Sequence, residues 1–225
     1  ALLRPPSHAA RRFSNVSISP DGQLVAWIGP SPADTAGAAP ALVVVDRKSS
    51  HTAVRTFGDA SEVAWSPDSR ALAFLSANGA VTLATVADGQ SRVVATIPGS
   101  TQGIRFAPDG KSVAVLYVRP EEITGDPTEA APRDTGVIGD IVDRQHLAVI
   151  DLSAGRLRVV TPADLYVYEY DWSPDSRRLV VSAANGSGNN NWWTARLYAV
   201  PADSGALTEI ARPATQIAVP RWSPD

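Results

Sequence analysis

The sequence lacks cysteine and methionine altogether among its 225 residues. Without cysteine the chain forms no disulfide, carries no thiolate nucleophile and holds no cysteine-ligated metal. A chain that begins with Ala1 and has no methionine lacks its initiator, so we expect that it derives from a longer precursor. For such a chain we expect a periplasmic or secreted location rather than a cytoplasmic one.

Charge of one sign and long apolar runs are also scarce. The formal net charge is −3, so nothing in the composition points to a nucleic acid or an anionic membrane surface as a partner. No apolar run approaches the ~18 residues that span a bilayer, and residues 1–6 lack the apolar centre of a signal peptide. We therefore expect neither nucleic-acid binding nor a membrane span.

Residues with metal-ligand spacing are missing too. None of the histidines, His8, His51 and His146, belongs to a paired-histidine motif on a helix. The acidic residues of the segment 119–143 do not follow the spacing of a calcium loop. The sequence thus predicts no metal and no other cofactor.

What the chain does contain is a repeated turn between two short apolar strands. Its copies are Ser19-Pro20-Asp21-Gly22, Ser66-Pro67-Asp68-Ser69, Ala107-Pro108-Asp109-Gly110, Ser173-Pro174-Asp175-Ser176 and Ser223-Pro224-Asp225. Proline presets the backbone of the second turn position and aspartate caps its own backbone, so each copy is typical of a β-hairpin. Most copies lie about 40 to 50 residues apart, a period that is typical of β-propellers.

The repeat predicts an all-β fold, a β-propeller of four-stranded antiparallel blades. After a lead-in at 1–13, we expect four blades at about 14–58, 59–98, 99–162 and 163–213. In the second blade, for example, we expect strands near 62–66, 71–76, 80–86 and 91–97. Residues 214–225 are expected to be the first strand of a fifth blade. Because a blade that is only begun cannot close a ring, we expect an incomplete propeller, a fragment of a longer protein.

Two long insertions interrupt the repeat, at 119–143 in the third blade and at 185–193 in the fourth. Both join the second and third strands of a blade. That loop emerges on the same face as the link to the next blade, such as Asp164–Tyr166, whereas the Ser-Pro-Asp turns occupy the other face. One face thus carries polar, aromatic-rich loops, and loops on a rigid scaffold are the usual place for binding sites.

Glu169 is the first candidate on that face. Strand alternation places Glu169 and Asp171 on one side of their strand, with Tyr168 and Tyr170 on the other. A carboxylate beside tyrosines at the mouth of the central channel suits a cationic group such as a peptide amine. The alternative is that Glu169, like its counterpart Glu62, pairs with an arginine of a neighbouring blade.

Trp192 and Trp193 follow a loop of glycine and asparagine that ends at Asn191. Exposed tandem tryptophans suggest a contact surface for a ligand or a partner domain. Alternatively, they lead into the third strand and pack between blades, and we expect this for one of the two.

Three stretches together resemble the N-terminal propeller of prolyl-oligopeptidase-family serine peptidases, and they are Phe13–Gly22, Asp171–Asp175 and Asn189–Tyr198. The Ser-Pro-Asp hairpin is shared with the periplasmic propeller of the Tol system and with other binding propellers. The Asn-Asn-Trp-Trp segment after a fourth-blade Trp-Ser-Pro-Asp is more specific to bacterial peptidases of this family, including dipeptidyl-peptidase-like and lasso-peptide isopeptidase-like members. The resemblance covers nearly the whole chain.

The resemblance implies a propeller of seven or eight blades, followed by an α/β-hydrolase domain with a Ser, Asp and His triad. This chain holds no such domain: its nearest match to Gly-x-Ser-x-Gly, Gly99–Gly103, centres on Thr101 and is expected to be a loop. No catalytic residue is therefore assigned. In the family the propeller screens substrates, and in the dipeptidyl branch its acidic residues hold a free peptide amino terminus, which adds weight to Glu169, Glu121 and Glu122.

Two functions stay open. In the first, the chain is the substrate-gating and substrate-binding propeller portion of a serine peptidase, and its partners are a peptide substrate and the C-terminal α/β-hydrolase domain of the same parent protein. In the second, it is a non-catalytic, protein-binding propeller of the Tol-system type. The candidate substrate-binding residues are Glu169, Tyr168, Glu121, Glu122, Asn191, Trp192 and Trp193.

Overall fold

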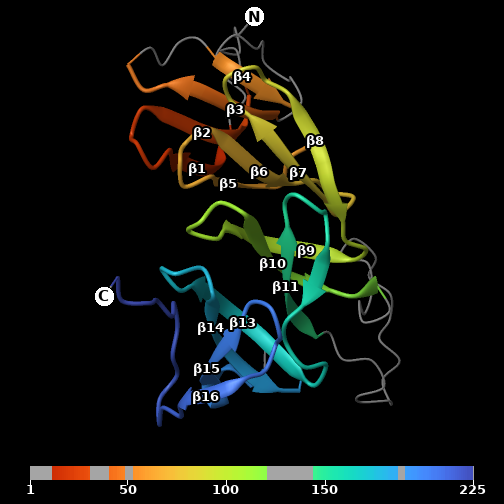
Figure 1. Cartoon of the computed structure of the whole chain (residues 1–225), viewed down its shortest axis with the longest axis vertical. Coiled ribbons are helices and arrows are strands. Elements are labelled where there is room, and N and C mark those ends of the chain that lie inside the picture. The colour runs from red at the N-terminus through yellow and green to blue at the C-terminus, as the bar shows by residue number, and fades with distance from the viewer. Residues whose placement is uncertain (1–11, 31–40, 49–52, 121–143, 187–190, 225) are drawn as a thin grey trace, which may run out of the picture.

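The computed structural model describes residues 12–30, 41–48, 53–120, 144–186 and 191–224. Within them the chain folds as an all-β protein of four antiparallel sheets with four strands each, as the repeat predicted. Figure 1 shows the four sheets following one another in sequence order along the long axis of the molecule. None of the helical turns within the described residues has the length and hydropathy that a membrane span requires.

Each sheet corresponds to one blade, and its strands lie side by side in the order of the chain. The first blade contains β1 (Ser14–Ile18), β2 (Leu24–Gly29), β3 (Ala41–Asp46) and β4 (Ala53–Phe57). The second contains β5 (Glu62–Trp65), β6 (Ala71–Leu75), β7 (Ala80–Thr85) and β8 (Ser91–Thr96). The third contains β9 (Ser100–Phe106), β10 (Ser112–Val118), β11 (Gln145–Asp151) and β12 (Leu157–Val159). The fourth contains β13 (Leu165–Trp172), β14 (Arg178–Asn185), the 3₁₀ turn η3 (Trp192–Thr194), β15 (Arg196–Pro201) and β16 (Thr208–Ala211).

The Ser-Pro-Asp turns owe their shape to hydrogen bonds that the aspartate side chain accepts from neighbouring residues of the same turn. In the fourth blade the hydroxyl of Ser173 donates to Asp175 Oδ1 at 2.6 Å, and the N–H of Arg177 donates to the same oxygen at 3.1 Å. These hydrogen bonds, the one from Ser173 above all, lower the pKa of Asp175. The first and second blades repeat the bond from serine to aspartate. The turn is therefore specified locally, which explains why it recurs wherever its residues do.

Buried apolar side chains fill the spaces between consecutive blades. Between the third and fourth blades the cluster includes Leu116 and Leu147 on one side and Val167, Tyr170 and Leu179 on the other. Similar clusters join the first blade to the second and the second to the third. Because full burial of one such side chain contributes about 1.5–3 kcal/mol, these faces supply most of the free energy that holds the blades together.

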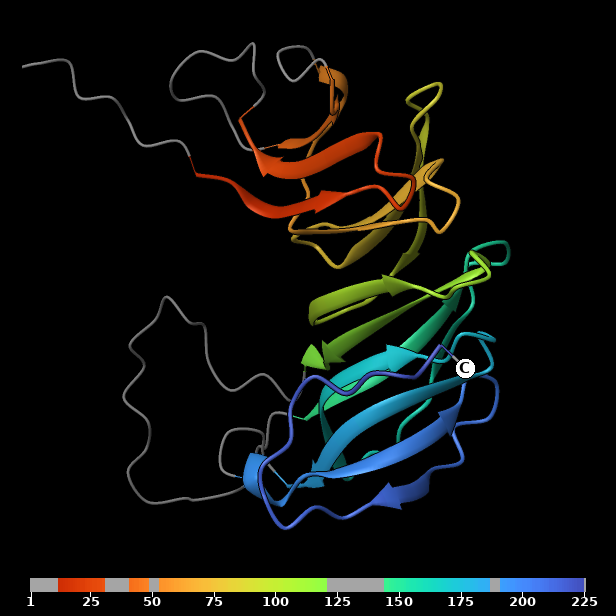
Figure 2. The ribbon, with the colours of Figure 1, turned by 90° about the vertical axis from the view of Figure 1, so that its left-hand side faces the viewer.

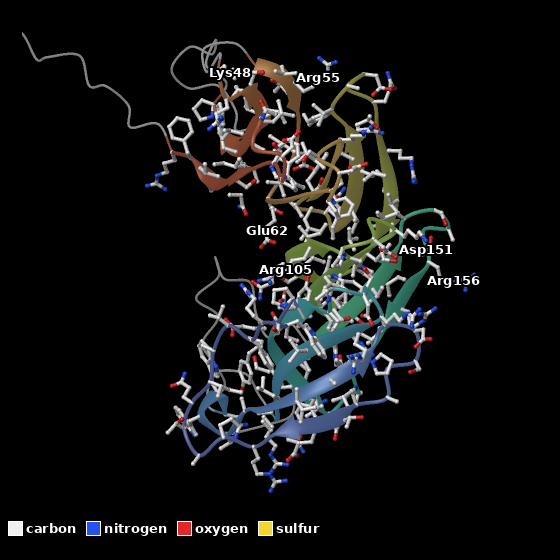
Figure 3. All side chains as sticks on the ribbon, turned by 60° about the vertical axis from the view of Figure 1, so that its left-hand side comes forward. Lys48, Arg55, Glu62, Arg105, Asp151 and Arg156 are labelled. Atoms are coloured by element: carbon white, nitrogen blue, oxygen red, sulfur yellow. The ribbon has the colours of Figure 1, made fainter. Side chains whose placement is uncertain are left out.

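An arginine on the outer strand of each of the first three blades ties that blade to the next. The three arginines are Arg55 on β4, Arg92 on β8 and Arg158 on β12. Each guanidinium donates to a main-chain carbonyl oxygen near the end of the third strand of the following blade, and the acceptors are Ala87, Leu152 and Ala202. Figure 3 labels Arg55 at its place on β4. We call these residues the clasp arginines.

Two segments differ from the sequence prediction. Residues 100–102, predicted as a loop, belong to β9, because they pair with β10. Residues 214–224, predicted as the first strand of a fifth blade, contain no strand within the described part of the chain. The first strand of each blade pairs only with the second strand of its own blade, and this segment has no such partner here. It lies alongside β13, and hydrogen bonds from its backbone to side chains of that strand hold it there. β9, the first strand of the third blade, is held against β5 in the same way.

Candidate functional site

The strands of the fourth blade have two chemically different ends. The Ser-Pro-Asp turn closes one end, between β13 and β14, whereas η3 and the start of β13 lie at the other. In Figure 2 the tight turns point to the right of the view and η3 lies to the lower left. We call these two sides the turn face and the loop face. The loop face is the side that the insertions predicted as the binding side.

A β-bulge in β13 changes which side chains reach the loop face. The ladder to β14 is regular up to Val167 and resumes at Glu169, so Tyr168 is an extra residue without a partner on β14. Val167 and Tyr170 both join the buried cluster between blades, whereas Tyr168 is only half-buried. The prediction that Tyr168 and Tyr170 share one side of the strand is therefore wrong, because the bulge shifts the alternation by one residue.

Three aromatic rings form what we call the aromatic platform, made of Tyr166, Tyr168 and Trp192. The rings of Tyr168 and Trp192 are stacked, with centroids 5.6 Å apart and an interplanar angle of 9°. The rings of Tyr166 and Tyr168 lie 4.9 Å apart at 44°. Burial, and then the neighbouring Tyr166, raise the pKa of Tyr168 to about 12, so its hydroxyl stays neutral. The platform is therefore uncharged at neutral pH.

The second tryptophan has a different environment from the first. The indole N–H of Trp192 donates to the carbonyl oxygen of Ile217 at 3.0 Å, which ties η3 to the C-terminal segment. Trp193 is 63% exposed. The side-chain amide of Asn191, the residue before η3, donates a hydrogen bond to the carbonyl oxygen of Asn185 at 2.9 Å. One tryptophan therefore packs and the other faces solvent, and the packed one contacts both Tyr168 of its own blade and Ile217 of the C-terminal segment.

Glu169 is held by the main chain of the C-terminal segment. Its Oε2 accepts a hydrogen bond from the N–H of Val219, a β-branched residue whose φ is +53°, in the left-handed region. Glu62, its counterpart on β5, accepts from the N–H groups of Gly103 at 2.5 Å and Ile104 at 3.2 Å. Among the described residues neither carboxylate forms an ion pair with arginine. The arginine alternative is thus wrong within this part of the chain, because a backbone N–H of the following repeat takes that place.

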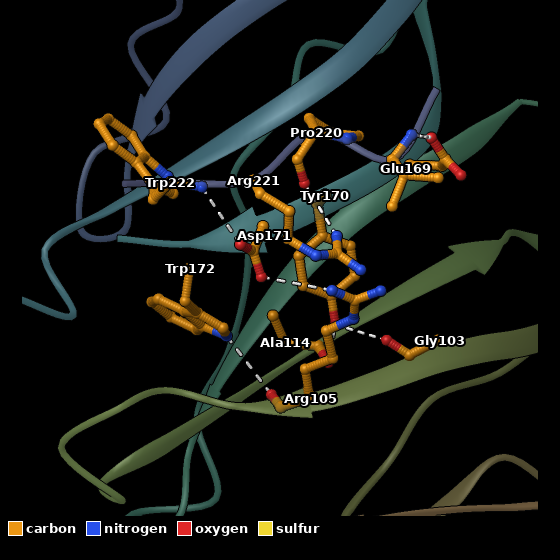
Figure 4. Close-up of polar contacts among 11 residues, drawn as sticks. Gly103, Arg105, Ala114, Glu169, Tyr170, Asp171, Trp172, Pro220, Arg221 and Trp222 are labelled. Atoms are coloured by element: carbon orange, nitrogen blue, oxygen red, sulfur yellow. Dashed lines mark hydrogen bonds and ion pairs between the residues drawn. The ribbon is translucent and has the colours of Figure 1, made fainter. Parts of the chain in front are cut away.

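Tyr170 and Asp171, which follow Glu169 on β13, bind this strand to the third blade (Figure 4). Asp171 forms an ion pair with Arg105 at 3.3 Å. The buried hydroxyl of Tyr170 lies 2.5 Å from the carbonyl oxygen of Gly103 and 2.7 Å from that of Ala114, and burial raises the pKa of Tyr170. Tyr170 and Asp171 are therefore part of the scaffold that positions the loop face.

The structure brings several of the predicted site residues together. Tyr168 and Trp192 are in contact, and Glu169 joins them through the segment 217–219, which bonds both Trp192 and Glu169. Glu121 and Glu122 lie outside the described residues. Tyr166 and the segment 217–219 were not predicted. The only feature of the sequence that pointed to Tyr166 is its place two residues before Tyr168. Nothing in the sequence indicates that Trp192 and Glu169 contact the segment 217–219.

This arrangement suits a cation with an apolar neighbour. A carboxylate provides charge-assisted hydrogen bonds, and aromatic faces attract ammonium groups. Among the described residues Glu169 Oε1 forms no hydrogen bond, so it remains an acceptor for a ligand. No group of three or more His, Asp or Glu side chains within the described ranges is arranged to hold a metal ion.

Comparisons with known proteins support the fold. No family model matches the sequence, and the search of curated proteins found no match either. Among solved structures, acylaminoacyl peptidase from Pyrococcus horikoshii superposes with a TM-score of 0.61 at 16% identity, over 90% of this chain and 32% of that one. TolB from Acinetobacter baumannii superposes with a TM-score of 0.57 at 15% identity, over 90% of this chain and 44% of that one. The β-propeller domain of Cps50 (Swd1) from Myceliophteria thermophila superposes with a TM-score of 0.62 at 12% identity, over 96% of this chain and 62% of that one. At such identities the likeness establishes the propeller fold, and the chain spans less than half of the peptidase and of TolB.

Proposed function

We propose that this chain is the substrate-gating and substrate-binding propeller portion of a serine peptidase. Hydrolysis of the peptide would take place in an α/β-hydrolase domain of the same parent protein. The observation that carries the proposal is the combination of an oriented carboxylate, Glu169, with the aromatic platform on the loop face. The likeness of the chain to acylaminoacyl peptidase supports the choice of a peptidase.

The site recognises a peptide through its free amino terminus. Glu169 Oε1 accepts hydrogen bonds from the ammonium group, while an apolar side chain of the peptide packs on Tyr168, Trp192 or the exposed Trp193. Because the N–H of Val219 already holds Glu169 Oε2, the carboxylate loses little conformational freedom when a ligand binds.

Binding of Ala-Phe-NH₂ to the full chain, followed by tryptophan fluorescence, tests this site. Glu169→Gln keeps an oxygen for the N–H of Val219 but removes the charge, so we expect the dissociation constant to rise at least tenfold. Glu62→Gln is the matched control, since Glu62 is held in the same way but has no aromatic platform beside it. Equal affinities of the wild type and Glu169→Gln would refute the assignment.

A non-catalytic, protein-binding propeller of the Tol-system type is the second candidate. It is favoured by the likeness to TolB, which covers the same 90% of the chain as the likeness to the peptidase. Labelling of the full-length parent protein with a fluorophosphonate serine probe separates the two. Labelling is expected for a peptidase, whereas an unlabelled parent that captures a protein partner would establish the second function. A periplasmic or secreted location belongs to the same proposal, and cell fractionation tests it.

A further inference from the structure

A groove of about 580 Å³ lies between the third and fourth blades on the turn face, away from Glu169 and the aromatic platform. Its apolar lining includes Val149, Trp172 and Pro201. Its walls carry two arginines from each blade, and these are Arg156, Arg158, Arg177 and Arg178. Figure 3 labels Arg156 beside Asp151 on the third blade. A groove of this volume lies within the usual range of ligand sites.

The internal repeat separates the arginines that the fold uses from those that it does not. Arg158 is one of the clasp arginines. Arg156 takes the place of Gln90 in the second blade, because the carbonyl oxygen of each accepts the hydrogen bond from the last residue of the third strand. Arg177 takes the place of Gln23 in the first blade by the same criterion, since both carbonyl oxygens accept from the residue that follows the third strand. Glutamine therefore satisfies the fold at both positions, although the place of Arg177 is also basic in the second and third blades, where Arg70 and Lys111 occupy it. The turns themselves do not require the positive charges of Arg156 and Arg177.

The aspartate carboxylates that line the groove accept hydrogen bonds within their own turns, and the arginines of the groove outnumber them. Asp151 Oδ1 accepts from the N–H groups of Ser153 and Ala154 at 2.8 and 2.9 Å, and Asp109 Oδ1 accepts from the N–H of Lys111 at 3.0 Å. With Asp203, three aspartates line the groove against four arginines. The balance attracts an anion, but the aspartates repel a dianion such as phosphate more strongly than a single carboxylate.

We propose that this groove binds an acidic peptide segment. Arginines stand on both walls, so two carboxylates separated by an apolar residue can each pair with a guanidinium, which binds carboxylates in a bidentate manner. The apolar residue between them packs on Trp172 and its neighbours. The site is independent of the peptide amine site on the loop face, which recognises the opposite charge.

Fluorescence anisotropy with labelled, N-acetylated and C-amidated Glu-Leu-Glu tests the proposal on the full chain. Acetylation removes the amine that the Glu169 site would take. We expect saturable binding that Gln-Leu-Gln does not reproduce and that salt weakens. The double variant Arg156→Gln/Arg177→Gln, which installs residues that other blades already carry, should bind at least tenfold more weakly. Arg70→Gln is the matched control, because Arg70 is the counterpart of Arg177 in the second blade and does not line the groove.

Thermal melts of the variants, followed by circular dichroism, verify that each one is folded. The proposal is overturned by the absence of saturable binding, by equal binding of Gln-Leu-Gln, or by an unchanged dissociation constant in the double variant. An equal loss in Arg70→Gln would also overturn it, since the effect would then be one of general charge. Competition by inorganic phosphate or glutarate as effective as that by the unlabelled peptide would assign the groove to free anions instead of a peptide.

Discussion

Removal of one buried hydroxyl, in Tyr170→Phe, tests how the fourth blade is fixed to the third. The side chain of Tyr170 is 2% exposed, and its oxygen lies within hydrogen-bond distance of the carbonyl oxygens of Gly103 and Ala114. Gly103 belongs to β9 and Ala114 to β10, so this one hydroxyl connects β13 to two strands of the preceding blade.

The expected cost follows from the hydrogen bonds alone, because phenylalanine keeps the ring and its packing. A hydroxyl has a single hydrogen, so the two carbonyl oxygens share one donor. Loss of a buried hydrogen bond costs about 0.5–1.5 kcal/mol, and an acceptor left buried without a partner raises the cost towards about 3 kcal/mol. We therefore expect the free energy of unfolding to fall by about 1–3 kcal/mol. Urea titration followed by circular dichroism measures it, with an unchanged m-value.

Tyr198→Phe provides the control for this measurement. Tyr198 is half-buried on β15, and its hydroxyl makes no hydrogen bond to the described residues. Its replacement should change the free energy of unfolding by no more than about 0.5 kcal/mol. If Tyr170→Phe were as stable as Tyr198→Phe, the hydroxyl of Tyr170 would not contribute to holding the third and fourth blades together.

Two further predictions concern the loop face and the turns. Trp192→Ala should lower the free energy of unfolding by at least about 1 kcal/mol, because the stack on Tyr168 is lost. Trp193 is 63% exposed, so Trp193→Ala should change the free energy of unfolding by less than about 0.5 kcal/mol. Equal urea midpoints for the two variants would contradict this prediction. Hydrogen bonds, chiefly from a serine hydroxyl, hold the pKa values of Asp21, Asp68 and Asp175 below 3.8 in the folded protein. The unfolded chain then binds protons more readily as the pH falls, so the melting temperature should be level from pH 7 to about 5 and decline below about 4, less steeply in Asp175→Asn.

Local chemistry explains why the sequence predicts the strands of the repeat so well. In the second blade each strand begins at the predicted residue, from Glu62 to Ser91. The hydrogen bonds that make each turn lie within five residues, as in Ser66 and Asp68, so they are legible in a short window. The clasp arginines are also repeated, but their acceptors are main-chain oxygens 32 to 60 residues away. Carbonyl groups carry no sequence signature, so these contacts were not predicted.

The candidate site was predicted only in part for the same reason. Glu169 and Trp192 stand out because they differ from the other copies of the repeat. The bulge that moves Tyr168 out of the core depends on the register with β14, which alternation along a single strand does not reveal. The partner of Glu169 is the N–H of Val219, 50 residues away. Its predicted arginine partner was an assumption about side chains, whereas the fold uses backbone.

If Glu169 recognises a peptide amine, as we propose, a double-mutant cycle between the protein and the peptide will show it. The dissociation constants of Ala-Phe-NH₂ and of its N-acetylated form are measured on the wild type and on Glu169→Gln. We predict that acetylation weakens binding to the wild type at least tenfold and leaves the already weak binding to Glu169→Gln unchanged. An equal loss on acetylation in both proteins would show that the amine and Glu169 do not interact, and that Glu169 is not the amine site.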